Sequence, residues 1–252
     1  MNLPESKVEA TRLTPKILLI YSLPKVGKTK QLSELENCLI LDLEGGAEMY
    51  DSLRVPINNT SDIDEVVAEI YKKAKTNGGI RPYKYIAVDT IDKLEEYCEK
   101  SATAKFKLTT IGKSFTGSSV LELPNGGGYF YLRKEMLLKL NELSRVCKHL
   151  ILVAHVKEKL LNKGGVEVTS RDISLAGKLS GIVCAACDAI GYMYRDTTTQ
   201  GKLMINFETF DNAIMGARFE HLAGKKFEFA WDKIYLPGAL EAPSAESHLS
   251  TD

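Results

Sequence analysis

The segment Ser22–Thr29 has residue types and a spacing that suit the binding of phosphate groups. It reads SLPKVGKT and follows an apolar run, Lys16–Tyr21, that predicts a buried strand. Gly27 allows the backbone to turn so that successive N–H groups face phosphate oxygens. The Lys28 ammonium can neutralise the outer phosphates, and the Thr29 hydroxyl can bind Mg²⁺. The segment therefore predicts a nucleotide site of the P-loop type that takes ATP and Mg²⁺.

One position departs from the usual pattern, which begins with glycine. Ser22 occupies it here, and a serine fits if its φ is negative. The alternative is a chance Gly-Lys-Thr in a turn, but the strand before the loop and a helix after it, to about Leu35, favour nucleotide binding. The expected nucleotide-binding residues are Ser22, Leu23, Pro24, Lys25, Val26, Gly27, Lys28 and Thr29.

Acidic residues follow two further apolar runs. Asp89 ends the run Tyr85–Asp89, where its carboxylate would hold Mg²⁺ through water beside the P-loop threonine. Glu44 follows the run Cys38–Leu43, and ligands bind at the carboxyl ends of strands in open α/β sheets. Glu44 would then polarise the water that attacks the γ-phosphate, unless it is an ordinary acid before a glycine turn. Asp42 competes for this role, but strand alternation directs it towards a helix layer.

A histidine follows a fourth apolar run, Leu150–Ala154. His155 could contact the γ-phosphate or its water there and report the nucleotide state to the next segment. The alternative is a strand-end histidine that bonds only to the backbone. The candidate catalytic residues from these runs and the P-loop are Lys28, Glu44, Asp89 and His155, with Thr29 and Asp89 as the metal-binding pair.

Apolar runs alternate with amphipathic segments along the chain. Helices are expected at Ser61–Thr76, Asp92–Lys105, Tyr129–Cys147 and Leu175–Cys187, and later strands at Ala189–Tyr194, Leu203–Phe207 and Phe227–Trp231. This order predicts an α/β fold, in which helices flank a mostly parallel central sheet with an antiparallel C-terminal edge. We expect an N-terminal arm at 1–14, one domain at 15–236 and a disordered tail at 237–252.

Composition and charge narrow the class of protein. Lys plus Arg and Asp plus Glu both number 33, so any nucleic-acid contact must come from a local patch. No apolar run approaches the roughly 20 residues that cross a bilayer, and we expect no membrane partner. The polar N-terminus lacks a secretion signal, which predicts a cytoplasmic protein. The scattered cysteines favour buried, reduced thiols, and Cys184 and Cys187 have metal-ligand spacing without a second such pair.

Several segments together resemble the RecA-type ATPases, and most of all the phage-type RecA-like nucleotide-binding proteins, which include single-strand annealing ATPases. The segments are SLPKVGKT, LDLEGG, YIAVDT, LILVAHVKEK, LAGKLSG and DAIGYMYR, and the likeness spans about Pro15–Leu236. It implies a RecA-like P-loop NTPase core, a homo-oligomeric ring or filament with ATP at subunit interfaces, and the host cytoplasm if a phage encodes the chain. It supports Glu44 as the water-activating acid and His155 as the γ-phosphate sensor. It also implies that Arg218 reaches the nucleotide of the neighbouring subunit.

The same resemblance implies two loops that hold single-stranded DNA. Phe106–Tyr131 and Lys157–Lys178 are in the corresponding places, and both carry basic residues. Basic side chains neutralise phosphates and aromatic side chains stack on bases, although ordinary solvated loop charge is the alternative. The candidate DNA-binding residues are Lys105, Lys107, Lys113, Lys157, Lys159, Lys163 and Arg171.

Three functions fit these observations. The first is an ATP-hydrolysing protein that handles single-stranded DNA in recombination or replication. The second is a P-loop kinase that transfers the γ-phosphate to a small acceptor, although the sequence has no arginine-rich lid segment of the kind such kinases usually carry. The third is a nucleotide-gated binding module with little turnover.

Overall fold

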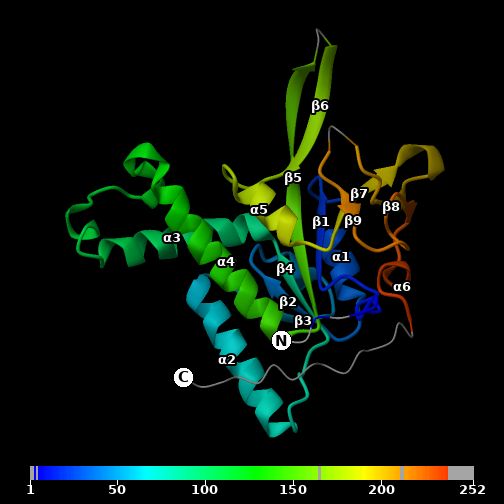
Figure 1. Ribbon diagram of the computed structural model, residues 1–252, viewed down its shortest axis with the longest axis horizontal. Coiled ribbons are helices and arrows are strands. Elements are labelled where there is room, and N and C mark those ends of the chain that lie inside the picture. The colour runs from blue at the N-terminus through cyan, green and yellow to red at the C-terminus, as the bar shows by residue number, and fades with distance from the viewer. Residues whose placement is uncertain (1–2, 4, 164–165, 211–212, 238–252) are drawn as a thin grey trace.

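One sheet organises the molecule. The computed structural model describes residues 3, 5–163, 166–210 and 213–237, with the side chains of 159–163, 166–168 and 199 excepted. The ten-stranded sheet has the main order β10-β8-β7-β1-β5-β4-β2-β3, with β6 paired to β5 and β9 paired to β7 (Figure 1). The strands are β1 (Ile17–Ser22), β2 (Cys38–Asp42), β3 (Leu53–Pro56), β4 (Tyr85–Asp89), β5 (His149–Lys163), β6 (Val166–Ile173), β7 (Ala189–Asp196), β8 (Lys202–Asn206), β9 (Gly216–Ala217) and β10 (Lys226–Glu228).

The central strands are parallel and buried on both faces. Strands β1, β2, β3, β4, β5 and β7 run in the same direction, and every residue of β2 and β4 is buried. Burial on both faces explains why β2 and β4 appear in the sequence as continuous apolar runs rather than as alternating ones. Strand β5 lies between β1 and β4, with Ser22 opposite His155 and Asp89 opposite Val153. The carboxyl ends of all three strands therefore meet at one edge of the sheet.

Helices cover the two faces of the sheet, as the alternation of segments predicts. Helices α2 to α5 pack on one face, for example through Leu94 and Leu143, whereas Leu32 of α1 and Ile234 of α6 pack on the other. None of the helices in the described part of the chain is long and apolar enough to cross a membrane. The helices are α1 (Lys28–Ser33), α2 (Thr60–Thr76), α3 (Ile91–Lys107), α4 (Gly128–Val146), α5 (Leu179–Ala186) and α6 (Trp231–Ile234), with 3₁₀ turns η1 (Gly46–Met49), η2 (Gly112–Ser114), η3 (Val120–Glu122), η4 (Pro124–Gly126) and η5 (Thr197–Thr199).

Helix α2 begins one residue earlier than the sequence predicts. Asn59 caps it, since its side chain accepts hydrogen bonds from the backbone N–H groups of Ser61 and Asp62. Asp62 returns the bond to the backbone of Asn59, which completes a capping box. The two cap bonds fix the start of the helix directly after β3, a short strand that the sequence analysis missed.

The segment after Ala154 differs from the loop that the sequence predicts. Strand β5 continues beyond Ala154 to Lys163 and pairs with β6 in an antiparallel hairpin, which projects from the body of the molecule (Figure 1). The sequence of β6 begins Val-Glu-Val-Thr, and β-branched residues favour strands. Gly164 and Gly165, between the two strands in the sequence, lie outside the described residues. The basic residues of this segment are therefore carried by a hairpin rather than by a loop.

The irregular segment between α3 and α4 forms a separate lobe. It contains the turns η2, η3 and η4, and it lies at the outer end of the two helices (Figure 1). Phe106 and Val120 pack in a small core of their own, with Phe115 and Tyr131 against it. The aromatic residues that the sequence assigns to DNA stacking therefore serve partly to hold this lobe together.

The C-terminal edge of the sheet is antiparallel, as predicted. Strands β7 and β8 pair antiparallel, and so do β8 and β10. The predicted strand Phe227–Trp231 is wrong in its second half, because Trp231 begins α6 and its Nε1 donates to the Gln31 carbonyl at 2.7 Å. Residues 3 and 5–14 of the expected arm lie outside helices and strands, and positions 238–252 of the expected tail lie outside the described residues.

Candidate functional site

The P-loop connects β1 to α1 and buries its lysine. The Lys28 ammonium donates to the Ser22 hydroxyl at 2.9 Å and to the Leu23 carbonyl at 3.3 Å. Burial lowers the pKa of Lys28, with smaller opposing effects from Asp89 and nearby acids. Within the described residues Lys28 forms no ion pair within 4 Å, so its buried charge meets only neutral acceptors. A buried ammonium with neutral partners is suited to receive an anion.

The serine that replaces the first glycine of the pattern fits the loop. Ser22 is the last residue of β1 and is absent from the positive-φ residues of the described chain. Its hydroxyl also orients Lys28, which a glycine could not do. Gly27 does need glycine, because its φ of 121° lies in a region that side chains disfavour. The departure at Ser22 is therefore compatible with a working cradle.

Thr29 and Asp89 lie together beside this lysine. The Thr29 hydroxyl donates to Asp89 Oδ2 at 2.6 Å. Burial raises the pKa of Asp89 to about 6, although the hydrogen bond from Thr29 opposes this rise. One hydroxyl and one carboxylate fit the oxygen ligands that Mg²⁺ prefers, with water and phosphate completing its shell. Thr29 and Asp89 are thus the residues that would hold Mg²⁺.

Replacing Asp89 with Asn should stabilise the metal-free protein at high pH. A carboxyl whose folded pKa lies above its ordinary value favours folding while protonated, and it loses this contribution as pH rises through about 6. We expect Asp89→Asn to raise the free energy of unfolding by roughly 2 to 3 kcal/mol at pH 8, and by little near pH 4. Urea unfolding at both pH values, without Mg²⁺, measures this difference. Asp51→Asn, at an exposed position, is the control, and a loss of stability at pH 8 in Asp89→Asn would contradict the prediction.

A tight loop after β2 presents Glu44 to the same edge. Asp42 accepts hydrogen bonds from the backbone N–H groups of Gly45 at 2.8 Å and Ala47 at 3.0 Å, so it shapes this loop. Glu44 is 40% exposed, and its Oε1 accepts a hydrogen bond from the Thr90 hydroxyl at 2.9 Å. Asp42 is therefore occupied by the backbone, whereas the other oxygen of Glu44 can meet water.

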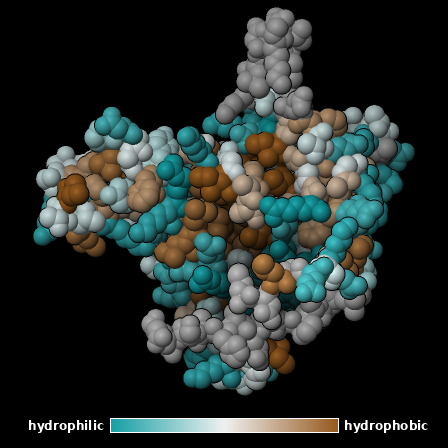
Figure 2. Space-filling model, viewed as in Figure 1, coloured by the Kyte–Doolittle hydropathy of each residue, from teal (hydrophilic) through white to brown (hydrophobic). Residues whose placement is uncertain are grey.

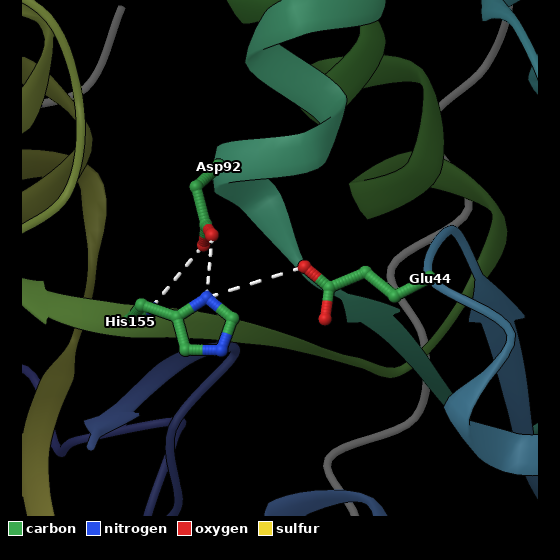
Figure 3. Close-up of side chains that lie close together, drawn as sticks. All are labelled: Glu44, Asp92 and His155. Carbon is green, nitrogen blue, oxygen red and sulfur yellow. Dashed lines mark hydrogen bonds and ion pairs between the residues drawn. The ribbon is translucent and has the colours of Figure 1, made fainter. Parts of the chain in front are cut away.

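His155 is held by an acid that the sequence analysis did not single out. Asp92 Oδ2 lies 2.6 Å from His155 Nδ1, and Asp92 Oδ1 accepts a hydrogen bond from the His155 backbone N–H at 3.2 Å. Figure 3 shows Asp92 at the start of α3, Glu44 on the loop after β2, and the imidazole between them, with Glu44 Oε1 4.0 Å from Nδ1. An ionised carboxylate only accepts hydrogen bonds, so Nδ1 donates and Nε2 is left for another group. The position of Asp92, three residues after Asp89 in the first turn of a predicted helix, is the signal that could have identified it.

The structure thus brings together Lys28, Thr29, Glu44, Asp89 and His155, at the carboxyl ends of β1, β2, β4 and the buried part of β5. Arg218 is not among them. Its guanidinium donates to Asp188 at 3.0 Å and to the Ala185 carbonyl at 3.1 Å. Asp188 also accepts from the backbone N–H of Ile17, the first residue of β1. Arg218 therefore lies at the opposite edge of the sheet from the P-loop of its own chain.

The candidate DNA-binding residues occupy two separate regions. Lys105 donates to both oxygens of buried Glu135, at 2.6 and 2.8 Å, so its charge is largely compensated. Lys107, whose ammonium lies 5.8 Å from the Phe115 ring, and Lys113 belong to the α3–α4 lobe. The remaining residues belong to the hairpin: Lys157 is exposed, Arg171 pairs with Glu158 at 3.1 Å, and the side chains of Lys159 and Lys163 lie outside the described set.

The five cysteines are free thiols in the structure. Cys38, Cys98, Cys147 and Cys187 are buried, Cys184 is partly buried, and burial raises the pKa of each. Among the described residues, the group whose atoms lie close enough to share a metal ion is Glu44, Asp92 and His155, and it contains no cysteine.

The chain is similar to a known protein family, to a curated protein and to a solved structure. The sequence pattern of a family described as "AAA domain" matches residues 14–222. A curated relative, the "SPbeta prophage-derived uncharacterized protein YorG" of Bacillus subtilis (strain 168), is 23% identical over 239 residues, which are 93% of this chain and 66% of that protein. A solved KaiC-like protein of Pyrococcus horikoshii OT3 is 15% identical, with a TM-score of 0.44 and 87% of both chains covered.

The family match spans the P-loop, both acids, the histidine and all the parallel strands. The predicted fold class, an α/β P-loop NTPase with a mostly parallel sheet, flanking helices and an antiparallel C-terminal edge, is confirmed. The chain belongs to the AAA domain family of P-loop NTPases.

Proposed function

We propose that this protein binds ATP with Mg²⁺, hydrolyses it, and handles single-stranded DNA in recombination or replication. The observation that carries hydrolysis is the arrangement around Glu44. This carboxylate is anchored by Thr90 on one oxygen, and it lies beside the Asp92–His155 pair at the edge that carries the P-loop. An acid placed to activate water favours hydrolysis over transfer of the γ-phosphate to a small acceptor.

Each residue of the site has a distinct task in this proposal. Lys28 binds the β- and γ-phosphates, and Thr29 with Asp89 holds Mg²⁺, which neutralises phosphate charge when bound. Glu44 accepts a proton from the attacking water as that water approaches the γ-phosphate. His155 contacts the γ-phosphate or the water through Nε2, while Asp92 fixes the orientation of the ring. Since β5 continues directly from His155 into the hairpin, the nucleotide state would be reported there.

In the expected ring or filament, Arg218 would contact the nucleotide that is bound to a neighbouring subunit. Arg218 lies too far along the sheet to reach the P-loop of its own chain, so it would act on the nucleotide of a neighbouring copy. Negative charge on the phosphate oxygens must be stabilised in the transition state, and an arginine from a neighbouring copy supplies the positive charge that does so.

Mixing two variants, each of which is expected to be inactive alone, tests this role of Arg218. Lys28→Ala lacks a working cradle but keeps Arg218, whereas Arg218→Ala has the reverse defect. If Arg218 acts on a neighbouring copy, a mixture should hydrolyse ATP faster than either variant alone. An unchanged rate in Arg218→Ala by itself would exclude the role. Arg54→Ala is the control, because Arg54 is also exposed and donates to a backbone carbonyl.

The main experiment measures ATP hydrolysis with and without single-stranded DNA, together with the mass of the protein in ATP by size exclusion. Stimulation by DNA and assembly in ATP would support the whole proposal. Phosphate transfer to a nucleoside acceptor would replace it with a kinase. Tight ATP binding without turnover would replace it with a nucleotide-gated binding module.

A further inference from the structure

A cavity of about 580 Å³ lies beside the P-loop, along β7, β8 and β10. Its volume falls within the range of about 300–1,000 Å³ that is usual for small-ligand sites. In its wall, Tyr192 and Met215 belong to the core cluster under α2 to α5, and Tyr194 packs against that cluster, whereas α1 packs on the other face of the sheet. The cavity therefore lies mainly on the face opposite α1, and it adjoins the phosphate cradle because Leu23 and Val26 of the P-loop form part of its wall.

Aromatic side chains line much of this cavity. The rings of Tyr192 and Tyr194 lie 5.8 Å apart and nearly parallel, at an angle of 13°. Tyr192 is buried, which fixes its ring, whereas Phe210 is 50% exposed. Planar faces at the wall of an open cavity suit the stacking of a nucleobase, and they do so without preference for one base.

Basic side chains outnumber acidic ones in the same wall. The basic residues are Arg171, Arg195 and Lys226, and the acidic residue is Glu208. The Arg171 guanidinium carbon lies 5.2 Å from the centre of the Tyr192 ring, so a cation and an aromatic ring lie side by side in the cavity wall. This combination suits a ligand that carries both a planar ring and a phosphate.

We propose that this cavity binds one nucleotide unit of single-stranded nucleic acid, with the base on the aromatic wall and the phosphate on the basic residues. The proposal rests on the DNA-handling part of the proposed function. Arg171 belongs to β6, so a strand that follows the projecting hairpin reaches the cavity at the base of that hairpin. Figure 2 shows that apolar side chains gather on the surface around α5, beneath the hairpin.

The position of the cavity also gives the strand a route to the ATP site. Leu23 and Val26 belong to the loop that cradles phosphate, and Arg195 Nη2 lies 3.4 Å from the place where a Cβ on Gly27 would be. A nucleotide unit in the cavity therefore contacts the outer side of the P-loop. We therefore expect occupancy of the cavity to be coupled to occupancy of the cradle, so that DNA in the cavity would stimulate hydrolysis.

Two exposed positions allow a test that leaves the core intact. Phe210→Ala removes a stacking face, and Lys226→Ala removes a phosphate contact. Their controls are Tyr71→Ala and Lys72→Ala on α2, since Tyr71 is also 50% exposed. Fluorescence anisotropy measures the affinity of the full chain for a labelled oligo-dT strand across a range of salt, and a fluorescent ATP analogue measures nucleotide affinity in parallel.

Phe210→Ala should weaken oligo-dT binding about tenfold or more, and Lys226→Ala should reduce the slope of log affinity against log salt by about 0.7. Neither variant should change affinity for the ATP analogue, and the controls should match the unaltered protein. Unchanged oligo-dT binding in both variants would overturn the cavity assignment. Weaker ATP binding with unchanged oligo-dT binding would also overturn it, because the cavity would then hold the nucleoside of ATP.

Photocrosslinking adds a readout that needs no variant. An oligo-dT strand that contains 5-iodouracil should crosslink to Tyr192, Tyr194 or Phe210, as mapped by mass spectrometry. Crosslinks confined to the α3–α4 lobe would contradict the assignment. If the unaltered protein hydrolyses ATP but binds no strand at all, the DNA-handling part of the proposed function fails together with this inference. Binding that is insensitive to the cavity removes the inference alone.

Discussion

Lys28→Ala is expected to abolish ATP binding. The ammonium is buried, is positioned by Ser22 and Leu23, and forms no ion pair within the described part of the chain, so its charge is available for phosphate. A hydrogen bond to a charged group contributes about 1.5–3 kcal/mol, and Lys28 would bond to two phosphate groups. We therefore expect affinity for an ATP analogue to fall at least about 100-fold, as measured by fluorescence titration.

Loss of binding in Lys28→Ala must be separated from loss of folding. Because burial lowers the pKa of Lys28, the buried charge does not favour the nucleotide-free fold, and the alanine variant should melt no lower than the unaltered protein. Lys30→Ala is the matched control, since Lys30 is exposed, lies two residues further along α1 and pairs with exposed Glu34 at 3.8 Å. Unchanged ATP affinity in a folded Lys28→Ala protein would refute the ATP site and with it the proposed function.

The continuous apolar runs made the core of the fold predictable. Strand β4 has the predicted bounds, Tyr85–Asp89, because a strand buried on both faces appears in the sequence as a short, continuous apolar run. The hairpin of β5 and β6 was not predictable in the same way. It is rich in charged residues and projects from the body, so its sequence is similar to that of a loop, and backbone pairing defines the two strands. Strand β3 was not predicted for a related reason, since its four residues are mostly exposed at the edge of the sheet and form no continuous apolar run.

The candidate site shows the same division between pattern and geometry. Lys28, Thr29 and Asp89 stand at fixed places relative to strands, and the structure brings them together as predicted. The contact between Asp92 and His155 joins two residues 63 positions apart, and it depends on the turn that begins α3. Likewise, the hydrogen bond between Thr90 and Glu44 depends on the loop that Asp42 shapes. These contacts depend on tertiary packing, which the spacing of residues along the sequence does not reveal.

Glu44→Gln should separate ATP binding from ATP hydrolysis. Glutamine keeps the size of the side chain and can still accept the hydrogen bond from Thr90, but it cannot take a proton from water. General base catalysis contributes about 10²- to 10⁴-fold, so the hydrolysis rate should fall by roughly that factor. Affinity for the ATP analogue should change little, because Lys28, Thr29 and Asp89 remain in place. Single-turnover hydrolysis and fluorescence titration measure the two quantities.

The control for Glu44→Gln is Glu48→Gln, an exposed acid on the turn η1 that follows the same loop. Its hydrolysis rate should equal that of the unaltered protein, since the backbone of the loop is held by Asp42 and not by Glu48. If Glu44→Gln hydrolyses ATP within about threefold of the normal rate, a general base is absent at this position, since its removal should cost far more. The Asp92–His155 pair would then be the remaining group placed to take the proton, and Asp92→Asn would become the variant that loses hydrolysis while it keeps ATP.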